Sequence, residues 1–122
     1  MNKFTADNID TTLSTIESLI LNCEKIQPKL QEGSSQQSLI KNRIKALCIA
    51  KSLITGKKHD FTAEEILKSA APVTSIINKS TKAISHIKEG TGAYTRLKKI
   101  IDAMTISLDY IEEAADDSKG DK

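Results

Sequence analysis

The sequence predicts an all-α protein, an up-down-up-down four-helix bundle built from two helical hairpins. Residues that favour strands are scarce, because aromatic residues make up 3% of the chain and valine occurs once. Apolar residues recur at helical spacing over four segments, and only 5 glycines and 2 prolines punctuate the chain. Leucine, isoleucine, valine and phenylalanine together make up roughly a quarter of the sequence, enough for the core of one domain.

The chain aligns with itself, without a gap, when it is shifted so that Phe4 falls on Phe61. Over the 51 pairs from Phe4/Phe61 to Ile54/Ile111, 14 residues are identical, where composition alone would give roughly three or four. We interpret this as an internal duplication that produces two hairpins related by a pseudo-twofold axis. The two repeats span residues 4–56 and 61–113.

The first and third helices begin with the same signal in both repeats. Thr62 is placed to cap a helix with Glu65 as its capping-box partner, and Phe61 and Ile66 occupy the two positions of a hydrophobic staple. The first repeat retains the staple and replaces the glutamate by asparagine, in the set Phe4, Thr5, Asn8 and Ile9.

Glycines and prolines set the expected helix ends. Gly33, Gly56 and Gly90 stand where helix C-caps are expected. Pro28 and Pro72 fall inside apolar helical patterns, where proline kinks or breaks a helix. The expected helices span residues 6–32, 35–55, 63–89 and 93–115.

In each of these four segments, apolar residues recur at helical spacing and form a stripe along one face, which predicts a helix. The second stripe is interrupted by Lys51, and the fourth is the most regular. Short links make successive helices antiparallel neighbours. We expect one bundle domain over residues 1–113, followed by a flexible C-terminal tail over 114–122. The fourth stripe comprises Tyr94, Leu97, Ile101, Met104, Leu108 and Ile111.

Composition narrows the class of protein and its location. The net charge of +2 argues against a protein that binds nucleic acid over its whole surface. We expect a bacterial cytoplasmic protein, since no secretory signal or membrane span is apparent and the residue usage suits an AT-rich genome. Cys23 and Cys48 form neither a disulfide framework nor a metal-ligand pair, and we expect no metal or cofactor.

The second helix carries a concentrated positive charge. No acidic residue occurs between Gly33 and His59, a stretch with six basic residues. They are candidates for binding a partner or, as an alternative, for weak nucleic-acid binding. The simplest interpretation is a solvated face paired with Glu17 and Glu24 of the first helix. The six residues are Lys41, Arg43, Lys45, Lys51, Lys57 and Lys58.

Two ring-bearing residues near the second hairpin turn are further candidates. Tyr94 could anchor a partner, or close the end of the core because it continues an apolar stripe. His86, with Lys88 and Gly90 close behind, resembles the phosphorylated histidine of histidine phosphotransfer domains. That family places lysine three residues after histidine within a continuing helix, whereas Lys88 follows His86 by two residues near an expected helix end.

The sequence contains no catalytic constellation, so we expect a non-enzymatic module that binds a protein. We expect a monomer, with a homodimer as the alternative. The segment Ile40-Lys41-Asn42-Arg43-Ile44, followed by Phe61-Thr62-Ala63-Glu64-Glu65, is loosely similar to bacteriocin immunity proteins. Those proteins are also small four-helix bundles, so the resemblance implies an immunity function as an alternative.

Overall fold

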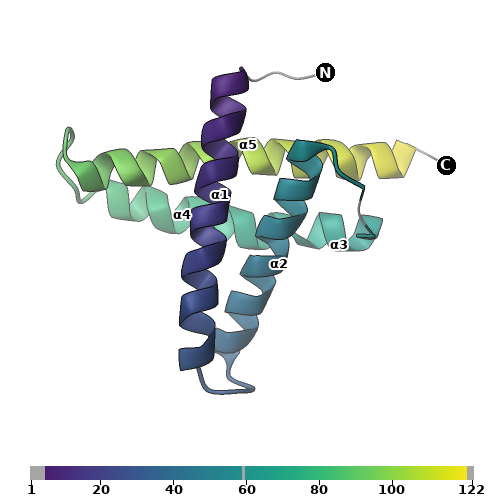
Figure 1. The fold of residues 1–122 in the computed structure, drawn as a ribbon, viewed down its shortest axis with the longest axis horizontal. Coiled ribbons are helices and arrows are strands. Elements are labelled where there is room, and N and C mark those ends of the chain that lie inside the picture. Colours follow the sequence, from purple (N-terminus) through teal and green to yellow (C-terminus); the bar gives the residue numbers. More distant parts are fainter. Residues whose placement is uncertain (1–4, 59, 121–122) are drawn as a thin grey trace.

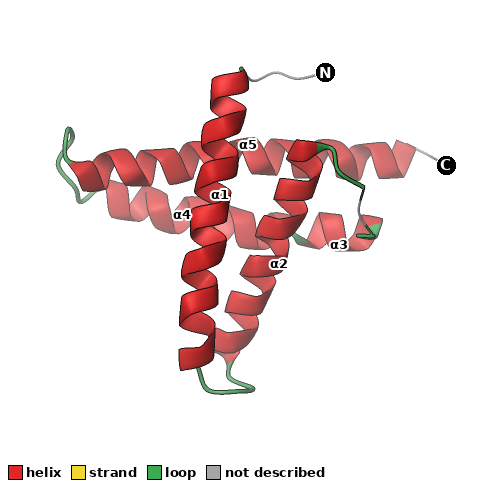
Figure 2. Ribbon diagram, in the orientation of Figure 1, coloured by secondary structure: helices red, strands yellow, loops and turns green. Residues whose placement is uncertain are grey.

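Helices account for all the regular structure in the part of the chain that is described (Figure 2). The computed structural model describes residues 5–58 and 60–120, the last four of these by their backbone alone. The all-α prediction is therefore confirmed. The helices are α1 (Ala6–Ile26), α2 (Ser35–Thr55), α3 (Ala63–Lys68), α4 (Ala70–Ile84) and α5 (Gly92–Gly120).

The helices form two antiparallel hairpins that cross one another (Figure 1). One hairpin consists of α1 and α2, and the other consists of α3 and α4 with α5. The expected bundle had all four helices along one axis, and the crossed arrangement differs from it. Short side chains on α2 and α5 let helices of the two hairpins approach closely. These residues, each at most 2% exposed, are Ala46, Ala50, Ala103 and Ser107.

The predicted capping signals are present at the helix starts. The Glu65 backbone N–H donates to Thr62 Oγ1 at 3.1 Å, and the Thr62 N–H donates to Glu65 Oε1 at 2.9 Å. This reciprocal pair confirms the capping box at the start of α3. At α1, Thr5 Oγ1 accepts from the Asn8 N–H at 3.1 Å, so the cap persists without a reciprocal glutamate. Phe4 lies outside the described residues.

Both prolines end a helix rather than bend it. α1 stops at Ile26, and Pro28 lies in a short 3-10 turn over Gln27–Lys29. The third expected helix divides into α3 and α4 at Ser69, three residues before Pro72. Proline has no N–H to continue the ladder, and its ring crowds the carbonyl four residues earlier, so a break there is favourable.

The last helix is longer than the sequence indicates. α5 continues to Gly120, whereas the expected helix ended near residue 115. Ala115 is 8% exposed, so packing against the body of the protein extends into the segment expected to be a flexible tail. Gly56, by contrast, ends α2 as expected, with a φ of 72° that favours glycine.

The two hairpin turns repeat each other in detail at the positions that the self-alignment of the sequence pairs. In the first turn the Leu30 N–H donates to the Gln27 carbonyl, and Ser34 caps α2 through the Gln37 N–H. In the second turn the Ile87 N–H donates to the Ile84 carbonyl, and Thr91 caps α5 through the Tyr94 N–H. Glycines with positive φ precede both caps, at Gly33 and Gly90.

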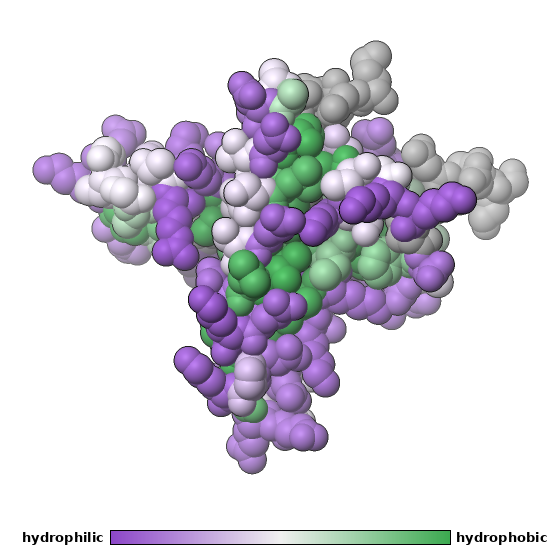
Figure 3. All heavy atoms as spheres, viewed as in Figure 1, coloured by the Kyte–Doolittle hydropathy of each residue, from purple (hydrophilic) through white to green (hydrophobic). Residues whose placement is uncertain are grey.

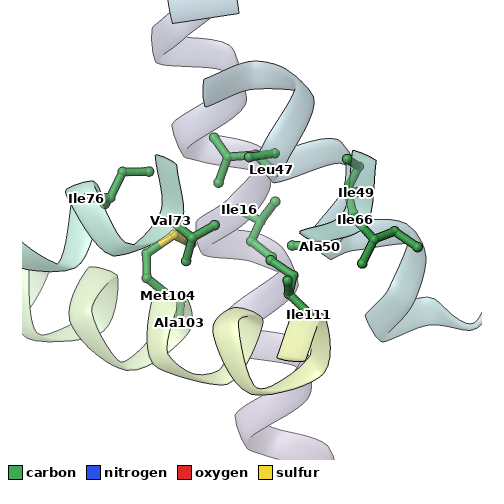
Figure 4. Packing of buried hydrophobic residues seen from close by; sticks show 11 residues of the cluster. Ile16, Leu47, Ile49, Ala50, Ile66, Val73, Ile76, Ala103, Met104 and Ile111 are labelled. Atoms are coloured by element: carbon green, nitrogen blue, oxygen red, sulfur yellow. The ribbon is translucent and has the colours of Figure 1, made fainter. Parts of the chain in front are cut away.

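The core lies where the hairpins cross. Side chains from both hairpins have no exposed surface there. They include Ile16 of α1, Leu47 of α2, Val73 of α4 and Met104 of α5. Figure 4 shows side chains of both hairpins meeting around Ile16. Burying side chains of this size stabilises the fold by about 1.5–3 kcal/mol each. Each hairpin therefore supplies one half of a shared core.

Burial follows the same pairing as the turns. Every buried residue described in the first hairpin has a buried counterpart at the aligned position of the second. The first set is Thr12, Ile16, Cys23, Ala46, Leu47, Ile49 and Ala50. The second set is Ser69, Val73, Ser80, Ala103, Met104, Ile106 and Ser107. The two hairpins thus present equivalent faces to each other.

Replacing Leu47 by alanine tests the shared core. Leu47 has no exposed surface, so Leu47→Ala should lower the free energy of unfolding by about 2–5 kcal/mol. Urea denaturation followed by circular dichroism measures this change. The control is Leu21→Ala, at a side chain 57% exposed, which should shift stability by less than about 0.5 kcal/mol. Equal losses in both variants would contradict the placement of the core.

Candidate interaction surface

The basic residues of α2 do not form one free cationic face. Lys45 makes an ion pair with Glu65 at the start of α3. Lys51 Nζ lies 3.0 Å from Glu17 Oε2 on α1, which confirms the pairing with Glu17 that the sequence indicates. Two of the six cations are therefore matched by carboxylates across helix contacts.

The remaining lysines of this run lie far apart. Lys41 is exposed in the first half of α2, whereas Lys57 and Lys58 are exposed in the segment after Gly56. At a rise of 1.5 Å per residue, Lys41 lies roughly 21 Å from the end of α2 at Thr55, beyond which Lys57 and Lys58 follow. A partner would therefore meet these charges as separate groups.

Tyr94 closes the second hairpin turn. Its side chain is half-buried, and its hydroxyl donates to Glu89 Oε2 at 3.4 Å. Its counterpart in the first repeat, Gln37, also bonds within its own turn, where its Oε1 accepts from the Gly33 N–H at 2.8 Å. Both residues tie a helix start to the preceding turn.

His86 stands in the turn after α4 rather than within a helix. α4 ends at Ile84, and the exposed His86 donates its backbone N–H to the Ala83 carbonyl at 3.1 Å. The histidine of a phosphotransfer domain lies in a continuing helix, so the local backbone here differs from that pattern. His59 lies outside the described residues.

A groove of about 480 Å³ lies between α2 and the broken helix α3–α4. We call it the α2–α3 groove. Its volume is within the range of sites that hold ligands or side chains of a partner. Its walls combine apolar side chains with polar and charged groups. The lining residues are Leu39, Asn42, Arg43, Lys45, Ala46, Ile49, Glu64, Glu65, Lys68, Ser69, Ala71, Pro72 and Ser75.

Large apolar side chains are exposed on α2 and on α3, the two helices beside this groove. Leu39 of α2, which lines the groove, is 57% exposed, and Leu67 of α3 is 52% exposed. Figure 3 shows hydrophobic residues extending from the first hairpin toward α3 on this face. The position equivalent to Leu39 in the second repeat is the charged Arg96, so an exposed leucine at this position is particular to the first hairpin.

Arg43 is the polar group that distinguishes the α2–α3 groove. Its side chain is half-buried, and its guanidinium lies within hydrogen-bonding reach of the Cys23 thiol on α1. Burial raises the pKa of Cys23, while Arg43 opposes this shift, so the thiol remains neutral near pH 7. No ion pair joins Arg43 to a carboxylate within the described residues, and Glu24 of α1 is the acidic residue that acts on the same thiol.

Both cysteines are free thiols, Cys23 buried and Cys48 half-buried. Burial also raises the pKa of the Cys48 thiol, so both thiols behave as small apolar groups. Among residues 5–58 and 60–120, no cluster of three or more His, Cys, Asp or Glu side chains could hold a metal ion. In the same ranges, no helix has the length and apolar character needed to span a membrane.

Comparisons with protein-family models, curated proteins and solved structures found no match to this chain. Its function is therefore inferred from the surface of the molecule.

Sequence reasoning identified Arg43 but missed the α2–α3 groove. The basic run pointed to α2 as an isolated helix, whereas the groove requires α3 and α4 to cross beside it. Pro72 was the available signal, because it marks the break that divides the opposite wall. Leu39 and Leu67 are ordinary apolar residues in sequence, and only the fold leaves them exposed.

The folded protein should be less stable in acid, because the ion pair between Lys45 of α2 and Glu65 of α3 depends on an ionised carboxylate. The Lys45 ammonium and the Thr62 N–H hold the pKa of Glu65 below its usual value of 4.5. A depressed pKa stabilises the folded state above the unfolded value, and this contribution is lost as the pH falls through 4.5 and below. Denaturation midpoints between pH 7 and pH 3 measure the effect.

Glu65→Gln is the variant for this measurement. It removes the titrating group, so the loss of stability between these pH values should be smaller than in the wild type. Glu64→Gln, at an exposed carboxylate that pairs with Lys68, is the control and should retain the wild-type slope. Identical slopes for all three proteins would contradict the assignment.

Proposed function

We propose that this protein is a non-enzymatic module that binds another protein through the α2–α3 groove. The observation that carries the proposal is the groove itself, whose lining includes Leu39, a large apolar side chain left 57% exposed. Leu67 lies outside the lining but is also more than half exposed, on the helix whose Glu64 and Lys68 line the groove. Exposed apolar groups beside a concave surface are typical of protein-binding sites. A partner would cover them and remove their apolar surface from water.

Binding to a protein is better supported than binding to nucleic acid. Lys45 and Lys51 are held by Glu65 and Glu17, and the other lysines of the basic run are dispersed. A nucleic-acid site favours cations gathered along one surface with aromatic side chains among them. The described part of the first hairpin contains no aromatic residue, which favours a protein partner.

We also propose that the two hairpins arose by duplication of one ancestral hairpin. The matched caps, turns and buried positions of the two repeats support this origin. On this view the second hairpin completes the core that the first hairpin begins. Residues such as Leu39, which differ between the two hairpins, were then acquired by the first hairpin for binding. In the proposed fusion the two hairpins already cover each other's apolar faces, which favours a monomer.

Capture from a lysate of the native host tests the binding surface. Leu39→Glu/Leu67→Glu should lose a protein that the wild-type chain retains after nuclease treatment, because the variant removes the exposed apolar side chains that the partner would cover. The matched control is Asn78→Glu/Thr95→Glu, which adds the same charge at exposed positions of the second hairpin. Mass spectrometry of tagged baits, with melting curves for each variant, gives the readout.

The control variant should retain the partner that the leucine variant loses. Equal recovery by all three folded baits would contradict a binding role for the α2–α3 groove. Recovery of partners only when nucleic acid is intact would instead favour the basic residues and overturn the proposal.

A further inference from the structure

The charge of the α2–α3 groove specifies the kind of protein segment that fits it. Its lining holds three cations, Arg43, Lys45 and Lys68, and two carboxylates, Glu64 and Glu65. Each carboxylate is matched by a lysine, through the pairs Lys45–Glu65 and Lys68–Glu64. Among the described residues, Arg43 is therefore the charged lining residue that no carboxylate matches.

Neighbouring groups keep this charge available. α2 contains no acidic residue along its length, so its wall offers Arg43 no counter-ion. The contacting Cys23 thiol is neutral near pH 7 for the reason given above. An acidic ligand is favoured here, and a basic ligand is repelled.

The shape of the surface favours a helix as the ligand. The groove runs between helices, and its lining includes the apolar residues Ala46, Ile49 and Pro72 together with the exposed Leu39. A volume of about 480 Å³ accommodates several side chains of an incoming segment. Amphipathic helices bind such grooves through apolar residues spaced at i, i+3, i+4 and i+7.

We infer that the α2–α3 groove binds an acidic amphipathic helix of the partner protein, whose apolar face lies against Leu39 and whose carboxylate pairs with Arg43. A half-buried guanidinium binds a carboxylate in a bidentate geometry, which fixes the register of the incoming helix. This inference rests on the proposed function and specifies its partner.

Two synthetic helical peptides test the inference directly. Both carry leucines at i, i+3, i+4 and i+7, and they differ only in having glutamates or lysines beside the leucines. Binding is followed by chemical-shift changes of the full chain in NMR titrations. We expect the glutamate peptide to bind with a Kd at least about fivefold lower than the lysine peptide, because only its charge complements Arg43. The shifts should centre on α2, α3 and α4.

Arg43→Glu should reverse this preference, so that the lysine peptide binds more tightly. The control is Arg96→Glu, which makes the same charge change at the other arginine of the chain, exposed on α5, and should leave the preference intact. Arg43→Gln is the second variant, in case the charge reversal lowers the stability of the fold. It should remove the preference without reversing it.

Absence of binding by either peptide at millimolar concentration would overturn the inference. Equal affinities for the two peptides, or a preference that survives both Arg43 variants in the folded state, would also overturn it. Because the peptides need no natural partner, peptide selectivity with a negative lysate capture would count against the proposed function alone. Lysate capture that depends on Leu39, without peptide selectivity, would count against the acidic helix alone.

Discussion

Burial of apolar surface between two crossed hairpins is the interaction on which the rest of the structure depends. A lone hairpin leaves Ile16 and Leu47, or Val73 and Met104, facing water, and these side chains are fully buried only where the hairpins meet. The small residues on α2 and α5 let the helix backbones approach closely enough for that burial. The caps and turns define each hairpin, but the stability of both comes from their contact.

The same crossing creates the surface proposed for binding. Because α2 passes beside α3 and α4 rather than along them, a groove remains between the helices and leaves Leu39 and Leu67 exposed. The break before Pro72 belongs to the opposite wall, which divides into α3 and α4 at Ser69. The groove is thus a consequence of how the core is packed, and Arg43 gives its lining an unmatched positive charge.

Local features were predictable from the sequence, whereas the arrangement of the hairpins was not. The bounds of α2, the capping box at Thr62 and the glycine C-cap at Gly56 follow from short-range rules that a few adjacent residues satisfy. The crossing depends on alanines that any helix can contain, so periodicity gave no indication of it. The pairing of Lys51 with Glu17 was predictable from charge, but the unpaired guanidinium of Arg43 depends on contacts between distant segments.

Separating the hairpins tests the dependence on their contact most directly. Fragments 1–58 and 59–122 can be prepared individually and examined by circular dichroism, alone and as an equimolar mixture. We predict that each fragment alone has little helix and no cooperative thermal transition, because half of the core is missing. The mixture should regain helix and a cooperative transition. A cooperative transition in either isolated fragment, at the melting temperature of the full chain, would contradict the account.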